Sequence, residues 1–266
     1  MEYLEDQYFW ASDVVRCFAD ALRAHPALHL IAVIPHHPDQ DGRFSQPLNL
    51  VGRQQALDDI RAAGGDRVGV YGIENRVGTP VYVHAKVCIV DDVWASVGSD
   101  NVNRRSWTHD SELSCAVIDD LVDEREPRIL DRFGDGARVF ARDLRLHLAR
   151  EHLDRDATGD GADADLLDPI GAFAAVRDSA QRLQQWHEDG KTGPRPPGRL
   201  RPYAAARLTP PPWPGRRRCI GSSPTPTRAP MPYAAPAGSD PHHTDRPPAL
   251  PAARGSNVLR RSKCRG

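Results

Sequence analysis

The sequence predicts an α/β layered domain followed by a segment that does not fold by itself. Expected strands and helices alternate along residues 1–190, which is the pattern of domains in which helices cover a sheet. One expected strand, residues 28–34, is almost wholly apolar, as strands covered on both faces in a parallel sheet are. Beyond residue 190 the composition changes, and 17 of the 24 prolines lie there. We therefore expect a folded domain over residues 1–190 and a tail over 191–266.

The first half of the expected domain contains two strands and two helices. Residues 1–9 are expected as a strand and 12–24 as a helix, with Ser12 or Asp13 as the cap that accepts from the first backbone N–H groups. After the 28–34 strand comes a polar loop over 35–45, at the kind of strand end where α/β folds bind ligands. A second helix is expected around 51–63. The apolar face expected for the first helix consists of Val14, Cys17, Phe18, Ala21 and Leu22.

The second half is expected to add a hairpin and two more helices. Strands are expected over 67–73, 81–90, 93–97 and 113–118, with a tight turn at Asp91-Asp92, because Asp favours turns. Helices are expected over 137–153 and 166–187. In the former, Phe140, Leu144 and Leu148 recur every fourth residue, so we expect them to face the core. Trp94 and Trp107 are expected to serve packing.

Charge divides the chain at the same place as composition. Residues 1–190 carry 20 Lys+Arg and 34 Asp+Glu, whereas residues 191–266 carry 15 and 2. A segment rich in Pro and Arg buries too little apolar surface to offset its conformational entropy, so we expect the tail to be disordered. The alternative is a basic arm for anionic lipid or nucleic acid, with clusters at Arg216, Arg217, Arg218, Arg260, Arg261, Lys263 and Arg265.

Signals for a compartment, a metal or a cofactor are weak. The sequence has neither a signal-peptide pattern nor a stretch long enough to span a bilayer, so a cytoplasmic location, with peripheral membrane contact as an option, is expected. The five cysteines lack metal-like spacing, and Cys88 and Cys115 are expected as small apolar side chains. No cofactor is expected. His36, His37, Asp39 and Asp41 resemble a metal cluster, but a Pro-flanked loop favours substrate access or plain exposure.

The segment from His84 to Glu112 is expected to gather polar groups at one point. His84 and Lys86 are two residues apart in an expected strand, so they should share a face. After the turn, the return strand delivers Gly98-Ser99 and then Asn101, at an expected helix start. Cleavage of a phosphodiester requires cations and donors on the non-bridging oxygens and a histidine for attack or proton transfer. The sequence therefore predicts a phosphate-cleaving site.

The pattern His84-x-Lys86-x4-Asp91-x6-Gly98-Ser99-x-Asn101 resembles the HKD motif of the phospholipase D superfamily. Residues 5–9, 33–35 and 108–113 resemble stretches that flank the second such motif in two-motif phospholipases D, so the resemblance covers about residues 1–190. It implies a layered α/β/α half-domain with a mixed sheet and a metal-independent site. His84 would be the nucleophile, forming a phosphohistidine, or the general acid. The other implied roles are phosphoryl binding by Lys86, Ser99 and Asn101, orientation of the histidine by Glu112, and a structural anchor of the turn at Asp91.

The resemblance implies hydrolysis or transfer of a phospholipid headgroup. Lipid is favoured over nucleic acid because the flanks resemble lipases and the acidic first 190 residues would repel a polyanion. A dimeric single-motif nuclease and an inactive remnant are the alternatives. Superfamily sites use two motifs and this sequence has one, so a second copy, or the N-terminal half of a longer enzyme, would supply the other. We favour the latter, because the chain begins abruptly at a strand and its composition changes again after about Leu208.

Overall fold

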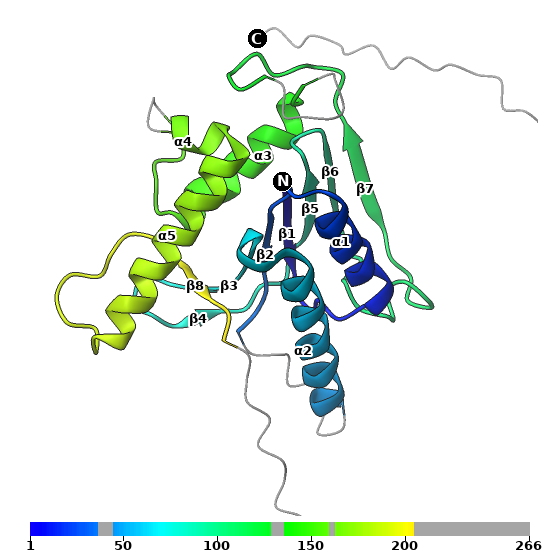
Figure 1. Ribbon diagram of the computed structural model, residues 1–266, viewed down its shortest axis with the longest axis horizontal. Helices are drawn as coiled ribbons and strands as arrows, with labels where there is room; N and C mark the ends of the chain where they lie inside the picture. The colour runs from blue at the N-terminus through cyan, green and yellow to red at the C-terminus, as the bar shows by residue number, and fades with distance from the viewer. Residues whose placement is uncertain (37–44, 129–135, 160–162, 205–266) are drawn as a thin grey trace, which may run out of the picture. The chain divides into compact units, whose positions relative to one another are not determined.

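A mixed sheet of eight strands lies at the centre of the computed structural model, which describes residues 1–36, 45–128, 136–159 and 163–204 (Figure 1). The strand order is β4-β3-β2-β1-β5-β6-β7, and β8 also pairs with β3. β1, β2 and β3 are parallel to one another, and the remaining pairs are antiparallel. The strands are β1 Glu2–Asp6, β2 Leu30–Val33, β3 Val68–Glu74, β4 Pro80–Val81, β5 Lys86–Val90, β6 Trp94–Gly98, β7 Ser114–Ile118 and β8 Leu200–Pro202.

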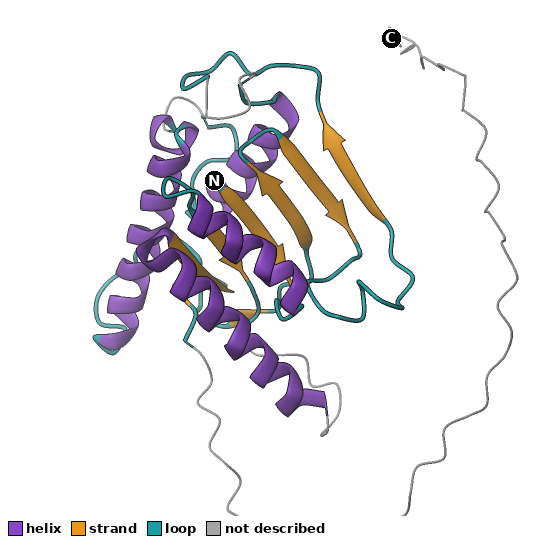
Figure 2. Ribbon diagram, turned by 45° about the vertical axis from the view of Figure 1, so that its right-hand side comes forward, coloured by secondary structure: helices purple, strands orange, loops and turns teal. Residues whose placement is uncertain are grey.

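Helices cover both faces of this sheet, so the expected layered α/β class with a mixed sheet is confirmed (Figure 2). Successive side chains of a strand point to opposite faces, and Tyr3 and Leu4 accordingly enter two different apolar clusters. Leu4 lies with α1 and α2, whereas Tyr3 lies with α3, α4 and α5. The helices are α1 Ser12–Ala24, α2 Ser45–Gly64, the 3-10 turn η1 Gly65–Arg67, α3 Val139–His152, α4 Ala164–Leu167 and α5 Pro169–Glu188.

Helix α1 corrects two expectations. Its N-cap is Ala11, so Ser12 and Asp13 lie in the first turn and neither forms the expected cap. Its buried residues are Val15, Ala19 and Leu22, so Leu22 is buried as expected, whereas Val15 and Ala19 take the place of the other expected residues. Cys17 is exposed, and Val14 and Phe18 are only half-buried. The helix therefore leaves a second apolar stripe that the core does not fully cover.

Helix α3 also turns a different face inward. Phe140 is 40% exposed, and Leu144 and Leu148 are only half-buried. Two arginines, Arg142 and Arg145, are almost completely buried instead. Both reach the carboxylate of Asp92 at the hairpin turn, and a buried charge requires a partner of this kind. The ion pair, which an apolar periodicity cannot reveal, sets the rotation of the helix.

Several element bounds differ from expectation. The expected 81–90 strand is divided, because residues 82–85 are irregular between β4 and β5. Helix α2 begins six residues earlier than expected. The expected 166–187 helix is two helices, since the side chain of Asp168 caps α5 by accepting from the Gly171 N–H at 2.8 Å. Cys115 is exposed on the edge strand β7 rather than packed as a small apolar side chain.

The end of the described region lies beyond the expected domain boundary at residue 190. Strand β8, at Leu200–Pro202, pairs with β3 and so belongs to the sheet. The rest of the expected tail, including its basic clusters, Cys219 and Cys264, lies outside the described residues, as do His37, Asp39 and Asp41. His36 is described, and its ring stacks on Tyr203. Of the helices that the structure describes, none combines the length and apolarity that crossing a bilayer demands.

Replacement of Glu2 by glutamine is expected to stabilise the protein above neutral pH. Burial raises the pKa of Glu2 to about 7, so the folded state binds this proton more tightly than the unfolded chain does. Stability from the neutral carboxyl is complete below pH 4.5 and is lost as pH rises through 7. Urea unfolding of Glu2→Gln and the wild type should therefore differ by about 1–3 kcal/mol at alkaline pH and by little near pH 4. Equal stability at both pH values would contradict this assignment.

Candidate active site

Strand register brings the predicted residues to one end of the β5–β6–β7 meander. Val87 pairs with Val97 on β6, and Gly98 pairs with Ser114 on β7. His84 precedes β5, Ser99 and Asn101 follow β6, and Glu112 precedes β7, so all of them extend from the same end. Gly98 allows the close approach there, because a Cβ atom would lie 2.6 Å from the Ser114 Cα. The register thus assembles residues separated by up to 28 positions.

Lys86 is the first residue of β5, and its ammonium group is held by two acceptors. Nζ donates to the His84 carbonyl oxygen at 2.9 Å and to Gln7 Oε1 at 3.1 Å. The other end of the Gln7 amide donates to the Tyr82 hydroxyl at 2.7 Å. Gln7 is buried, so a single amide fixes both Lys86 and Tyr82. Partial burial lowers the pKa of Lys86.

His84 does not share a strand with Lys86, because it lies in the irregular segment before β5. Its side chain is exposed, and its ring stacks at 6.5 Å on the ring of Tyr82. The contact between His84 and Lys86 runs through the histidine's backbone carbonyl. An exposed imidazole can meet a substrate without displacing protein.

Asp6 supports this end of the sheet from β1. It pairs in register with Lys86, and its carboxylate accepts from the backbone N–H of Tyr8 at 2.7 Å and of Val102 at 2.9 Å. The Val102 bond ties the segment that carries Asn101 to β1. Asp6 is 1% exposed, and burial raises its pKa to about 6. The buried Asp6 carboxyl therefore anchors both the segment that contains Tyr8 and the segment that contains Val102.

Glu112 is oriented by two hydroxyl groups. Ser99 Oγ donates to its Oε2 and Ser106 Oγ donates to its Oε1, both at 2.6 Å. These hydrogen bonds, that from Ser106 first, lower the pKa of Glu112. The negative charge of Glu112 raises the pKa of Lys86, although the effect of burial, which lowers it, is larger. Within the described part of the chain, no hydrogen bond joins the Glu112 carboxylate to the His84 ring.

Asn101 precedes a series of bends and turns, and the expected helix does not start there. Its backbone oxygen accepts from the Trp107 indole at 2.8 Å. Its side-chain oxygen is buried and finds no hydrogen-bond partner among the described residues. A buried polar atom of this kind calls for an explanation, and a ligand is one.

Asp91 lies at the other end of β5, roughly 17 Å from Lys86 at the usual rise of a strand. Its carboxylate binds the amino group of Met1. Asp91 and Asp92 both have positive φ, at 50° and 55°, and Val93 N–H donates to Val90 O, as in the tight turns that join hairpin strands. Asp92, which the sequence did not single out, is the buried partner of Arg142 and Arg145. The pair of aspartates is thus remote from His84.

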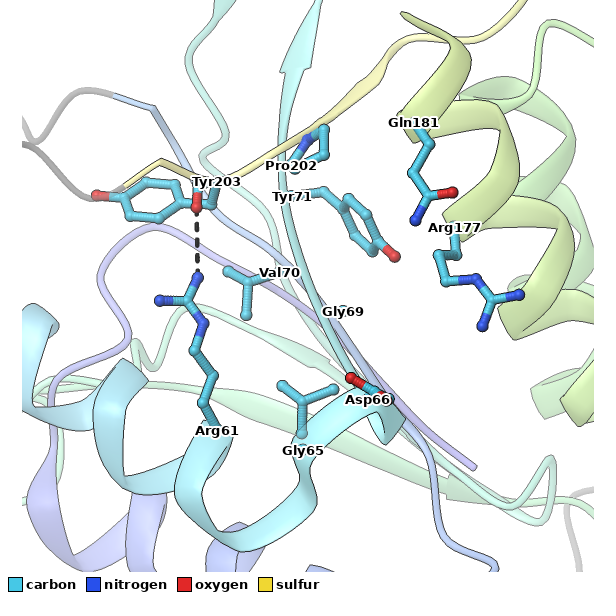
Figure 3. Close-up of a pocket in the computed structure, with 11 residues that line it drawn as sticks. Arg61, Gly65, Asp66, Gly69, Val70, Tyr71, Arg177, Gln181, Pro202 and Tyr203 are labelled. Carbon is cyan, nitrogen blue, oxygen red and sulfur yellow. Dashed lines mark hydrogen bonds between the residues drawn. The ribbon is translucent and has the colours of Figure 1, made fainter. Parts of the chain in front are cut away.

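A large hollow elsewhere on the molecule contains none of the predicted residues. Its volume is about 630 Å³, and it lies between α2, β3, β8 and α5. Figure 3 shows Arg61 and Arg177 on two sides of it, with Tyr71 between them and the Arg61–Tyr203 hydrogen bond marked.

Sequence reasoning missed two residues of the site, namely Gln7, which bonds Lys86, and Ser106, which bonds Glu112. Gln7 belongs to a flank whose resemblance was noted, but only the antiparallel pairing of β1 with β5 places it beside Lys86. Ser106 lies six residues before Glu112, and the turns between them bring its hydroxyl to the carboxylate. Neither the Gln7–Lys86 contact nor the Ser106–Glu112 contact could be predicted from the spacing of residues within a single helix or strand.

Comparison with known proteins places the similarity on this same region. The sequence model of a family described as cardiolipin synthase, PLD-like domain, matches residues 49–127. Phospholipase D C of Dictyostelium discoideum is 46% identical over 77 residues, which is 27% of this chain and 4% of that protein. Phospholipase D1 of Schizosaccharomyces pombe is 37% identical over 99 residues, 32% of this chain and 7% of the relative. The chain thus spans a small fraction of the relatives' length.

Similar solved structures include a phospholipase D family member, Nuc, from Salmonella typhimurium. It is 23% identical, with a TM-score of 0.32, and the match covers 44% of this chain and 64% of Nuc. NucT from Helicobacter pylori is 14% identical, with a TM-score of 0.30 over 43% of this chain and 65% of NucT.

Proposed function

We propose that this chain, which belongs to the phospholipase D superfamily, is a phosphodiesterase that releases the headgroup of a phospholipid through His84. The observation that carries the proposal is the gathering of His84, Lys86, Ser99, Asn101 and Glu112 at one end of the β5–β6–β7 meander. The matched residues 49–127 contain all five.

Each of these side chains suits one part of the reaction. The Lys86 ammonium would neutralise a non-bridging phosphoryl oxygen, as fixed cations do for developing charge. Asn101 Nδ2 would donate a hydrogen bond there, and the Ser99 hydroxyl would do so once it turns away from Glu112. His84 would either attack phosphorus, forming a nitrogen–phosphorus bond while the headgroup oxygen leaves, or protonate that oxygen. Glu112 would orient the imidazole once the exposed ring rotates toward it.

One histidine cannot attack phosphorus and protonate the leaving oxygen in the same step. The proposal therefore includes a second polypeptide that supplies the other group, either a second copy or the other half of a two-motif enzyme. Exposed apolar side chains lie on the segments that carry the site: Tyr82 is 42%, Trp107 57% and Leu113 83% exposed. A partner placed over the site would cover these three side chains.

Replacement of Lys86 by glutamine is expected to lower release of choline from phosphatidylcholine by about a hundredfold or more, because the loss of a donor that stabilises transition-state charge has effects of this size. KM should rise as kcat falls, because the phosphodiester already carries the negative charge that Lys86 would bind before the reaction begins. The measurement is choline release by the full chain over a range of protein concentrations. If two copies form the site, the rate per molecule rises with concentration.

Wild-type rates in the Lys86→Gln variant would contradict the proposal. Absence of choline release by the wild type at every concentration would contradict activity of this chain alone. Cleavage of plasmid DNA in place of lipid would favour the nuclease alternative, against which the net negative charge of residues 1–190 argues.

A further inference from the structure

We propose that the hollow between α1 and the β5–β6–β7 meander holds an alkyl chain of the substrate, with Lys86 at its polar end. The inference rests on the proposed function and adds the place where this chain would hold the hydrocarbon part of a phospholipid. The hollow has a volume of about 310 Å³, within the range of small-ligand pockets.

The walls of the hollow are mainly apolar. Leu4 of β1, Val14 and Phe18 of α1 and Val102 form one side. Two tryptophans, Trp94 and Trp107, complete the lining together with Val87, Cys88, Ser96 and Ser114 of the meander. Burial raises the pKa of Cys88 to about 12, so its thiol stays neutral and serves as an apolar wall. This lining suits a hydrocarbon.

The apolar walls lie at the margin of the core. Leu4 and Val102 are buried in the cluster beneath α1 and α2, and the half-buried Val14 and Phe18 pack against this cluster and also line the hollow. Figure 2 shows the helices of this face over the parallel strands, while the last strands of the meander extend beyond them. The fold thus keeps apolar side chains half-exposed beside the candidate site.

The charge of Lys86 sets the orientation of an amphiphile in the hollow. Lys86 lines both the hollow and the candidate phosphoryl site, so a phosphate bound to its ammonium would have its chain directed along the apolar walls. Asp6 and Asp100 also line the hollow, and burial raises the pKa of both carboxyls. Because Asp6 has a pKa of about 6, its repulsion of a phosphate head weakens as pH falls through that value.

A second hollow, of about 790 Å³, adjoins the first. Both are lined by Val14 and Trp107, so these two side chains stand between them. The second is lined further by Ala11, Ser12, Asp13, Cys17, Arg104 and Thr108. A longer chain would pass Trp107 and enter it.

The test is a titration of the full chain with a series of alkyl phosphates of increasing length, below their micelle concentrations, followed by tryptophan fluorescence. Because Trp94 and Trp107 line the hollow, binding should change their emission, and Trp94→Phe/Trp107→Phe should abolish the change. Affinity should rise about fourfold with each methylene until the hollow is filled. The readout does not require turnover, so it is independent of the proposed activity.

Ser96→Phe is the filling variant, because Ser96 lies on β6 and lines the hollow. It should weaken binding of the longer alkyl phosphates at least tenfold, whereas Ser96→Ala, which leaves the space open, should bind as the wild type does. Ser114→Phe, on the exposed edge strand, is a second filling variant with little risk to folding. Arg177→Ala, in the hollow of Figure 3, is the control for binding elsewhere.

The proposal is overturned if affinity does not depend on chain length, if both filling variants bind like the wild type, or if Arg177→Ala abolishes binding. Failure of the proposed function would give another result in the two assays. In that case alkyl phosphates bind with the expected dependence on length, but bis(p-nitrophenyl) phosphate, which has no alkyl chain, is not hydrolysed. If both hold, Ser96→Phe hydrolyses that small diester normally and loses activity on long-chain phospholipids.

Discussion

Replacement of His84 by alanine is expected to abolish hydrolysis of bis(p-nitrophenyl) phosphate, with a loss of at least about a thousandfold, the scale seen when a nucleophile or its base is removed. The physical reason is that, of the gathered residues His84, Lys86, Ser99, Asn101 and Glu112, only His84 carries an imidazole, the group suited to both attack and proton transfer at neutral pH. Release of p-nitrophenol by the full chain is the measurement. The loss should appear in kcat, because an exposed imidazole contributes little to ground-state binding.

Folding should be unaffected by this change. The His84 side chain is exposed, and surface substitutions of this kind usually change stability by about 0.5 kcal/mol or less. The matched control is His147→Ala, since His147 is an exposed histidine of α3 that lines none of the hollows described above. Hydrolysis that persists in His84→Ala would exclude His84 as the nucleophile, since p-nitrophenolate leaves without needing a proton, and an equal loss in His147→Ala would show that the effect is not specific to His84.

Replacement of Asp92 by asparagine is expected to destabilise the protein by about 3–5 kcal/mol, the range for breaking a buried ion pair on one side. Asp92 Oδ1 accepts from Arg145 Nε at 2.6 Å, and Oδ2 accepts from Arg145 Nη2 at 2.7 Å. Arg142 Nε adds a contact at 3.3 Å. All three side chains are at most 2% exposed, so the change leaves the buried Arg145 guanidinium without its carboxylate, whereas Arg142 keeps a contact with Asp123 at 3.6 Å. Urea unfolding by circular dichroism is the measurement.

Asp91→Asn is the matched control, because it changes the adjacent residue of the same turn. Asparagine tolerates the positive φ of both positions, so neither variant strains the backbone. Asp91 is partly exposed and pairs with the amino group of Met1, so its loss should cost less than half as much. If the two variants prove equally stable, the buried arginines are not what anchors this turn.

The sequence predicts the class of fold because its signals are local. The apolar run over residues 28–34 becomes β2, which is buried throughout and parallel to both neighbours. The Asp-Asp turn joins β5 and β6 as expected. Both features are formed by residues close together in the chain, so a run of apolar residues or a pair of turn-forming residues is enough to predict them.

The parts that could not be predicted depend on contacts between distant residues. The rotation of α3 follows from Asp92, 50 and 53 positions before Arg142 and Arg145, and apolar spacing suggested another face. Gln7 reaches Lys86 across 79 positions, through the pairing of β1 with β5. The segment before β5 is irregular, so His84 and Lys86 are related by a backbone hydrogen bond rather than by a shared strand face. Motif spacing identified the residues of the candidate site but not how they are held.

The most direct test of the proposed function is phosphorus NMR of dihexanoyl phosphatidylcholine incubated with the full chain. Cleavage of the headgroup bond should replace the substrate resonance with that of phosphatidic acid, and none should be formed by His84→Ala. If two copies form the site, the rate per molecule should rise with protein concentration. Formation of phosphocholine, which requires cleavage of the other phosphoester bond, would contradict the proposed reaction. A spectrum that stays unchanged with the wild type at all protein concentrations would contradict activity of this chain alone.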